Sequence, residues 1–213
     1  MFPSRSRKTK ESLSKDGGWN KENFADFCYT VRMARKIVIG VSGSIAAYKA
    51  CELVRLFVKN GDDVHVVMTD HAKAFVTPLT FRTLSRNPVQ NAMFADPLNW
   101  KPGHIGLAES ADLLVIAPAT ANILAKMAHG LADDLLSSVA LATHAPILVA
   151  PAMNTGMWTN PATQANLALL RARGVYVVQP GDGDLACGVT GPGRMADPGE
   201  IYAAVGGLLE ERK

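Results

Sequence analysis

Three residues of different types, His104, Asn154 and Cys187, have side chains that could do chemistry in this chain of 213 residues. His104 lies between glycines in a predicted loop, and the unperturbed histidine pKa of about 6.5 suits acid–base work. Asn154 offers two N–H donors and one acceptor without charge, which suits it to hold a carboxylate. Cys187 lies in a glycine-rich segment, where an accessible thiol can donate or accept a proton. A lone histidine in a loop is nevertheless more often incidental than catalytic.

Asn154 follows an apolar run, residues 147–150, that is typical of a buried strand. Pro151 has no N–H to donate to a sheet, so the strand should end there. We therefore expect Asn154 in a loop beyond the carboxyl end of a parallel strand. Ligands of open α/β sheets bind at that edge.

The first part of the folded chain reads as a strand at 36–41, a helix at 45–60 and a strand at 64–68. This order implies a parallel pair of strands with a right-handed crossover. In the turn before the helix, Gly43 lets the backbone approach a ligand and Ser44 can cap the helix, whose free N–H groups make an anion site. The dinucleotide fingerprint G-x-G-x-x-G is absent. The alternative is a tight turn without a ligand.

The second strand ends at Thr69 and Asp70, which have two interpretations. An acid at this position can bind a ribose hydroxyl, so a nicotinamide-dependent enzyme is one interpretation of the sequence. Alternatively, the two residues cap a short helix at 72–76.

Apolar strands and helices alternate through the rest of the chain, which predicts an α/β protein with a mostly parallel sheet. Residues 181–195 contain five glycines and read as a long flexible loop, and Cys187 within it favours a lid over a linker. The remaining predicted strands are 113–117, 147–150 and 175–178, and the remaining predicted helices are 78–85, 106–111, 123–128, 135–142, 161–173 and 198–211.

Composition excludes several classes of protein. The chain is 48% hydrophobic and 19% charged, as is usual for globular proteins, and no apolar run approaches the ~18–20 residues of a membrane span. The net charge of +3 comes entirely from residues 1–33, and a neutral remainder argues against nucleic acid as the main partner. Three cysteines without regular spacing suggest neither a disulfide framework nor a zinc site, and they predict a cytoplasmic protein.

Residues 1–33 are polar, basic and without periodicity, and they lack the apolar segment of a secretory signal. We expect a disordered leader there, with Met33 as a candidate start just before the first strand. The length of the remainder suits one sizeable core, so we predict a single domain at 34–213.

Four motifs in the same order resemble those of the flavin-dependent cysteine decarboxylase family, over roughly residues 36–205. Two long motifs in the right order are more specific than any single one. The motifs are Gly43-Ser44-Ile45-Ala46-Ala47-Tyr48-Lys49, Ala117-Pro118-Ala119-Thr120-Ala121-Asn122, Pro151-Ala152-Met153-Asn154 with Met157-Trp158, and Ala186-Cys187-Gly188 with Gly191, Gly193, Arg194 and Met195.

The resemblance implies a doubly wound, mostly parallel α/β sheet of the Rossmann or flavodoxin-like kind, with helices on both faces, that binds FMN and no metal. It also implies a homotrimer, or a dodecamer built of trimers, with sites between subunits. The catalytic residues that it implies are His104, Asn154 and Cys187. The cofactor-binding residues are Gly43, Ser44, Ile45, Thr69, Thr120, Ala121, Asn122, Ile123 and Ala152, and the substrate-binding residues are Asn154, Met157, Ala186, Arg194 and Met195.

The implied reaction is the decarboxylation of 4′-phosphopantothenoyl-L-cysteine to 4′-phosphopantetheine in coenzyme A biosynthesis. A carboxylate leaves easily when an electron sink lies two bonds away, and oxidation of the thiol carbon by FMN to a thioaldehyde supplies that sink. His104 would assist removal of the thiol proton, and Asn154 would orient the carboxylate. Cys187 would supply a proton when reduced FMN returns its hydride, so the cycle is redox-neutral.

Three other functions stay open. Relatives that decarboxylate the carboxy-terminal cysteine of a peptide share the Asn154 motif but lack the cysteine motif, so Cys187 argues against that substrate. A non-catalytic flavin protein that regulates a partner is the second, and a nicotinamide-dependent dehydrogenase, weakened by the missing glycines, is the third. Many bacterial members continue into a domain that ligates cysteine to phosphopantothenate. The sequence stops at Lys213, so we expect the decarboxylase step alone or a fragment of a longer protein.

Overall fold

The computed structural model describes residues 34–93, 103–186 and 188–210. The predicted leader at 1–33 and the candidate catalytic residue Cys187 lie outside the described residues, and the single-domain assignment stays a prediction.

Five parallel strands form the central sheet, in the order β2-β1-β3-β4-β5. The chain reverses direction of winding between β1 and β3, which is the switch point of flavodoxin-like folds. The doubly wound parallel sheet predicted from the sequence is thereby confirmed. The strands are β1 (Lys36–Val41), β2 (Asp63–Met68), β3 (Leu113–Ala119), β4 (Ile147–Pro151) and β5 (Tyr176–Val177).

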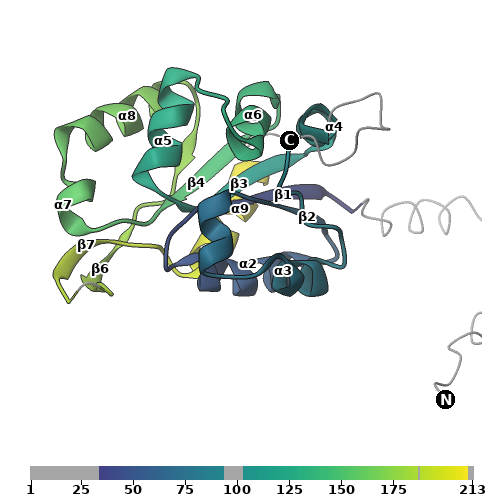
Figure 1. The fold of residues 1–213 in the computed structure, drawn as a ribbon, viewed down its shortest axis with the longest axis horizontal. Helices are drawn as coiled ribbons and strands as arrows, with labels where there is room; N and C mark the ends of the chain where they lie inside the picture. Colours follow the sequence, from purple (N-terminus) through teal and green to yellow (C-terminus); the bar gives the residue numbers. More distant parts are fainter. Residues whose placement is uncertain (1–33, 94–102, 187, 211–213) are drawn as a thin grey trace, which may run out of the picture. The chain divides into compact units, whose positions relative to one another are not determined.

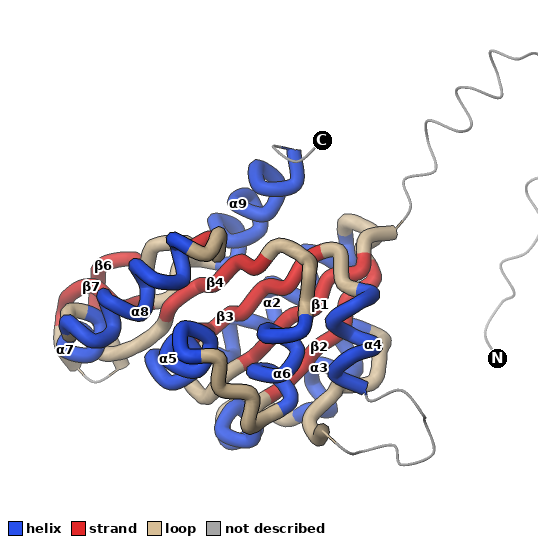
Figure 2. Tube along the Cα trace, turned by 90° about the horizontal axis from the view of Figure 1, so that it is seen from above, coloured by secondary structure: helices blue, strands red, loops and turns tan. Residues whose placement is uncertain are grey.

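Helices cover both faces of this sheet (Figures 1 and 2). One face carries α2 (Ala47–Lys59), α3 (Pro78–Ser85) and α9 (Pro198–Glu210). The other face carries α4 (Gly103–Ser110), α5 (Ala121–His129), α6 (Leu135–Ala142) and α8 (Pro161–Ala172). A 3₁₀ helix, η1 (Asp70–Ala74), follows β2.

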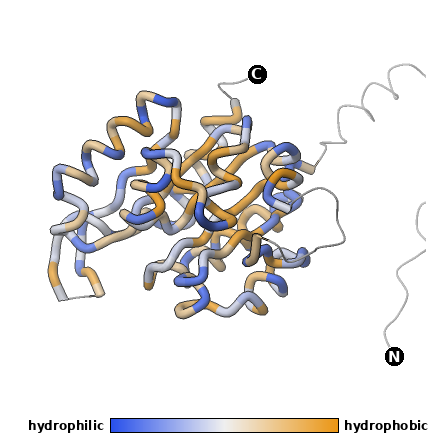
Figure 3. The backbone as a smooth tube through the Cα atoms, turned by 45° about the horizontal axis from the view of Figure 1, so that its top comes forward, coloured by the Kyte–Doolittle hydropathy of each residue, from blue (hydrophilic) through white to orange (hydrophobic). Residues whose placement is uncertain are grey.

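The sheet separates two hydrophobic cores, and hydrophobic residues are concentrated in the interior of the described part of the chain (Figure 3). Phe57 of α2 is fully buried in the first core, where its ring meets the edge of Tyr202 at 5.2 Å between centroids. Leu124 and Leu136 are fully buried in the second core. Strands buried on both faces need apolar residues at every position, which is why they read as unbroken apolar runs.

Two sequence predictions about local structure are wrong. Residues 181–195 are mainly an antiparallel hairpin, β6 (Gly181–Asp184) with β7 (Thr190–Arg194), and not a flexible loop. His104 lies in the first turn of α4 and not in a loop, because that helix begins before the residue 106 predicted from the sequence.

Pro151 is the last residue of β4, paired with Ala119, and Asn154 begins a short helix, α7 (Thr155–Trp158), instead of an open loop. This turn of helix lies beside β7 at one end of the sheet (Figure 1).

Within the described residues, no helix combines the length and the apolar character needed to cross a membrane. The same part of the chain contains no cluster of three or more histidine, cysteine or acidic side chains arranged to hold a metal ion.

Candidate functional site

The site residues predicted from the sequence gather mostly at the carboxyl edge of the sheet, where β1, β2, β3 and β4 end. Parallel strands all present this edge on the same side, so segments far apart in sequence meet there. Ser42, buried after β1, ties two of these ends together. Its hydroxyl donates to the carbonyl of Pro118 at 2.7 Å and accepts from the N–H of Thr120 at 3.0 Å.

The turn between β1 and α2 is packed closely against η1 at Gly43. A methyl group at this glycine would overlap the Cβ of His71 and lie 3.1 Å from the backbone carbonyl carbon of His71. The Ser44 hydroxyl accepts from the N–H of Ala46 at 3.3 Å, so it supports the start of α2. The structure therefore shows both the tight turn and the start of helix α2 that the sequence predicted.

Two threonines among the predicted cofactor residues cap helices. Thr69 Oγ1 accepts from the N–H of Ala72 at 3.3 Å, and Thr120 Oγ1 accepts from the N–H of Ile123 at 3.4 Å. This is the capping role that the sequence left open for Thr69.

Asn154 is held by its own short helix. Its side-chain Oδ1 accepts from the N–H of Gly156 at 2.8 Å, as an N-cap residue does. This hydrogen bond fixes the orientation of the side-chain amide, so Oδ1 and Nδ2 have defined positions.

The β6–β7 hairpin packs directly on the Asn154 segment. The N–H of Met153 donates to the carbonyl of Gly193 at 3.0 Å, and a methyl group at Gly193 would overlap the carbonyl oxygen of Met153. At Gly191 a methyl group would lie 2.9 Å from the Thr155 hydroxyl oxygen. Because β7 has glycine at both positions, the two backbones can approach this closely.

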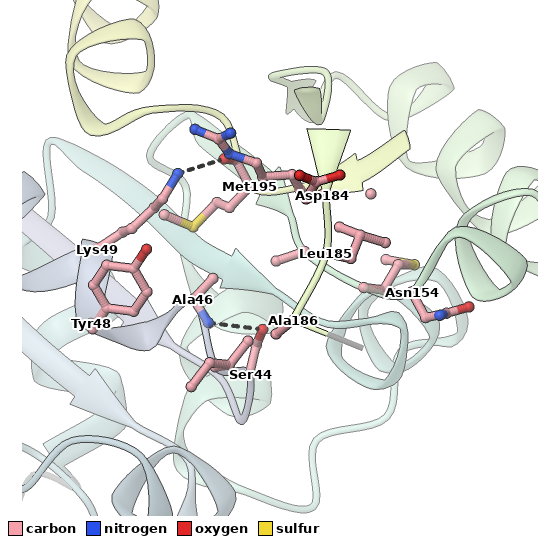
Figure 4. A pocket seen from close by; sticks show the side chains of 14 residues that line it. Ser44, Ala46, Tyr48, Lys49, Asn154, Asp184, Leu185, Ala186 and Met195 are labelled. Atoms are coloured by element: carbon pink, nitrogen blue, oxygen red, sulfur yellow. Dashed lines mark hydrogen bonds between the residues drawn. The ribbon is translucent and has the colours of Figure 1, made fainter. Parts of the chain in front are cut away.

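A cavity of about 570 Å³ lies between the start of α2 and the Asn154–hairpin unit (Figure 4). Lys49 and Tyr48 lie on the α2 side, and Asn154 lies on the opposite side. Volumes of roughly 300–1,000 Å³ are usual for small-molecule sites. The cavity is lined by Ser44, Ile45, Ala46, Tyr48, Lys49, Ala152, Met153, Asn154, Asp184, Leu185, Ala186, Gly193, Arg194 and Met195.

Cationic side chains line part of this cavity. Lys49 Nζ lies 2.7 Å from Asp197 Oδ1, and Arg194 Nη2 lies 3.4 Å from the same oxygen. The hydrogen bond from Lys49, with its positive charge, lowers the pKa of the Asp197 carboxyl below its usual value. The Asp197 carboxylate is therefore negatively charged at neutral pH, between the two basic side chains.

The cavity thus unites seven of the predicted site residues, and it leaves others outside its lining. Met157 is exposed on α7. His104 is half-buried in α4, and its Nδ1 is a buried atom with no hydrogen-bond partner in the described part of the chain. The predicted residues outside the lining are Gly43, Thr69, Thr120, Ala121, Asn122, Ile123, Met157 and His104.

Sequence reasoning gave no role to several lining residues, above all Tyr48 and Lys49. Both belong to a motif quoted for the family resemblance, and they follow Ile45 by three and four positions. Residues at this spacing share one face of a helix. That spacing within the motif was the signal available from the sequence.

Comparison with known sequences finds relatives that are named for coenzyme A biosynthesis. The coenzyme A biosynthesis bifunctional protein CoaBC of Vibrio vulnificus (strain YJ016) is 47% identical over 169 residues, which cover 79% of this chain and 42% of that protein. The protein of the same name from Escherichia coli (strain K12) is 50% identical over 164 residues, covering 77% and 40%. The chain therefore spans less than half the length of these relatives.

Solved structures share the fold over nearly the whole of their own length. A PPC decarboxylase mutant complexed with pantothenoylaminoethenethiol has a TM-score of 0.75 and 35% identity, covering 83% of this chain and 99% of that one. The FMN-dependent cysteine decarboxylase SpaF has a TM-score of 0.70 and 32% identity, covering 81% and 98%.

These matches confirm the resemblance inferred from the motifs. A model of the family described as Flavoprotein matches residues 29–210, which include every described element of the fold. The chain belongs to the flavoprotein family.

Proposed function

We propose that this chain is an FMN-dependent decarboxylase that converts 4′-phosphopantothenoyl-L-cysteine into 4′-phosphopantetheine and CO₂. The observation that best supports this proposal concerns the Asn154 segment and the hairpin, which hold the two most specific motifs. Together they form one wall of a single cavity, opposite the start of α2. The relatives named for coenzyme A biosynthesis and the PPC decarboxylase structure support this substrate.

The residues around the cavity suit FMN. Ile45, Leu185 and Met195 give apolar surface for a flat ring, and Ala152 has only a methyl group to limit its approach. The start of α2, at Ser44 to Ala46, favours a phosphate because helix N-termini attract anions. When bound there, FMN would supply reversible two-electron oxidation of the carbon that bears the substrate thiol.

Asn154 acts on the carboxylate that is to leave. Its amide nitrogen is oriented by the Gly156 hydrogen bond to Oδ1, so it holds the carboxylate without adding charge to it. An uncharged donor is suited to this task, because a cation would stabilise the carboxylate before its electrons move into the developing product.

His104 accepts the substrate thiol proton in this proposal, although it does not line the cavity of its own subunit. We therefore extend the proposal to the assembly: a homotrimer, or a dodecamer built of trimers, in which His104 of one subunit completes the cavity of another. His104 is only half-buried in its own chain, so part of the residue is accessible to a neighbouring subunit, which supports this arrangement.

Cys187 donates the final proton to the product carbon. It follows Ala186, which lines the cavity, and it precedes β7 in sequence. The composition and the relatives' biosynthetic role support a cytoplasmic location for this activity.

The first experiment is the visible absorption spectrum of the purified protein, followed by mass analysis of the released chromophore. We expect FMN, and release of CO₂ from 4′-phosphopantothenoyl-L-cysteine. A peptide with carboxy-terminal cysteine serves as the competing substrate. A Cys187→Ser variant should stall with an oxidised intermediate. Turnover by that variant at the wild-type rate would refute the proposed decarboxylase function.

A mixing experiment tests the shared site. His104→Asn and Asn154→Asp proteins should each be inactive alone, and subunit exchange between them should restore part of the activity, because some sites then contain both native residues. If mixed trimers form but stay inactive, the site lies within one subunit.

A further inference from the structure

Asp197 lies just outside the cavity lining, in the short connection between β7 and α9. Its carboxylate oxygen Oδ1 accepts from Lys49 Nζ at 2.7 Å and faces Arg194 Nη2 at 3.4 Å. Both cations line the cavity, Lys49 from α2 and Arg194 from the hairpin. One carboxylate oxygen therefore joins two elements that face each other across the cavity.

Lys49 depends on this contact because its side chain is only 12% exposed. Its other hydrogen-bond acceptor in the described chain is the carbonyl of Met195 at 3.3 Å, drawn as a dashed line in Figure 4. A largely buried ammonium group is stable only when charged or polar partners replace its water. Without the Asp197 charge, Lys49 would turn toward solvent and release the end of β7.

The hydrogen bonds at the start of α9 use the backbone of Asp197 and not its carboxylate. The backbone N–H of Asp197 donates to Glu200 Oε2 at 2.9 Å, and the Asp197 carbonyl accepts from the N–H of Ile201 at 3.1 Å. Glu200 thus serves the helix start, while the Asp197 side chain serves the two cations. The pair offers a variant and a matched control at the same turn.

We propose that Asp197 is a positioning residue that holds the β6–β7 hairpin against α2 through Lys49 and Arg194. The hairpin carries part of the substrate wall, so its docking sets how tightly substrate is held. The effect on substrate rests on the proposed function. The effect on hairpin docking does not.

The test compares Asp197→Asn with Glu200→Gln in the full chain loaded with FMN. Hydrogen exchange of residues 181–194 should rise at least about threefold in Asp197→Asn, because a part-exposed ion pair of this kind is lost while the shape is kept. KM should rise by a similar factor with little change in kcat, because a smaller fraction of molecules is competent to bind. Glu200→Gln should affect the exchange of α9 and leave the hairpin and KM unchanged.

A double-mutant cycle with Lys49→Met shows whether Asp197 acts through the lysine. Asp197→Asn should have a smaller effect on hairpin exchange in the Lys49→Met background than in the wild type. Equal exchange of the hairpin in Asp197→Asn and wild type, or equal effects of Asp197→Asn and Glu200→Gln, overturns the proposal. If wild-type protein shows no turnover, the proposed function fails, and hydrogen exchange still decides the role of Asp197.

Discussion

Replacement of Gly43 by alanine should weaken FMN binding by steric overlap alone. The added methyl group would overlap His71 Cβ, and it would lie 3.1 Å and 3.3 Å from the carbonyl carbon and Cα of that residue. Two of these three contacts are backbone atoms, which cannot rotate away. The turn must therefore move off η1, and it carries Ser44 and the start of α2 with it.

The size of the effect follows from the cost of overpacking. Forcing an extra methyl group into a closely packed site typically costs about 1–3 kcal/mol. If that cost falls on the conformation that binds FMN, the dissociation constant should rise roughly 5- to 140-fold, at about 1.4 kcal/mol for each factor of ten.

The assay is a titration of apoprotein with FMN, followed by quenching of flavin fluorescence. Gly199→Ala is the matched control, because a methyl group there meets nothing within 4 Å. His71→Gly in the Gly43→Ala background should recover part of the lost affinity by removing the overlapping Cβ.

Equal affinity of Gly43→Ala and Gly199→Ala for FMN would refute the reasoning. It would mean that the turn adjusts without cost, or that this turn does not hold the cofactor. A thermal melt separates these outcomes, because overpacking without loss of affinity should still lower the melting temperature.

Three further predictions concern the Asn154 wall and the start of α6. Asn154→Asp should keep the cap on Gly156 but repel the substrate carboxylate, so CO₂ release should fall about 100-fold or more while flavin absorbance is retained. Gly193→Ala, at a φ of 132° and against the Met153 carbonyl, should undock the hairpin at a cost of about 1–3 kcal/mol, seen as faster exchange of 190–194 but not of β2. Asp134→Ala should cost about 1 kcal/mol in urea unfolding at pH 7, because Asp134 caps α6. Burial opposes its charge, but hydrogen bonds from Lys126 and Ser137 outweigh burial and lower the Asp134 pKa. Its stabilisation is therefore complete above the unfolded value of about 3.9 and lost as the pH falls through the lower folded pKa, so the two proteins should converge in stability below that folded pKa.

The sheet was predictable because its signal is local and strong. Residues 36–41 are apolar at nearly every position, since β1 is buried on both faces, and the observed strand has the predicted bounds. The bounds of α3 were also predicted, because Pro78 is suited to the first turn of a helix.

The hairpin was not predictable, because its residues show no alternation of apolar and polar side chains. The segments Gly181–Asp184 and Thr190–Arg194 are held by backbone pairing and by the contact of Gly193 with Met153. That contact joins residues 40 positions apart, so it is absent from any local pattern.

The early start of α4 has a similar tertiary cause. The helix packs against the end of α6, where the Thr143 hydroxyl donates to the carbonyl of Ala108 at 2.9 Å. Gly103 and Gly106 lower the intrinsic preference of this stretch for a helix, and a sequence-based boundary therefore falls too late. The position of Asn154 beyond the carboxyl end of β4 was predicted from the strand that precedes it, whereas the position of His104 relative to the cavity could not be inferred.

Among the described residues, β6 and β7 pair with each other and form a sheet separate from the five-stranded one. The described chain thus consists of a five-stranded scaffold with two cores and a short hairpin at one end of it. The hairpin can change sequence without disturbing the strands of the scaffold, provided that the glycines that face Met153 and Thr155 remain. Exchange of this one short segment would alter one wall of the cavity, while the sheet and its two cores would be left unchanged.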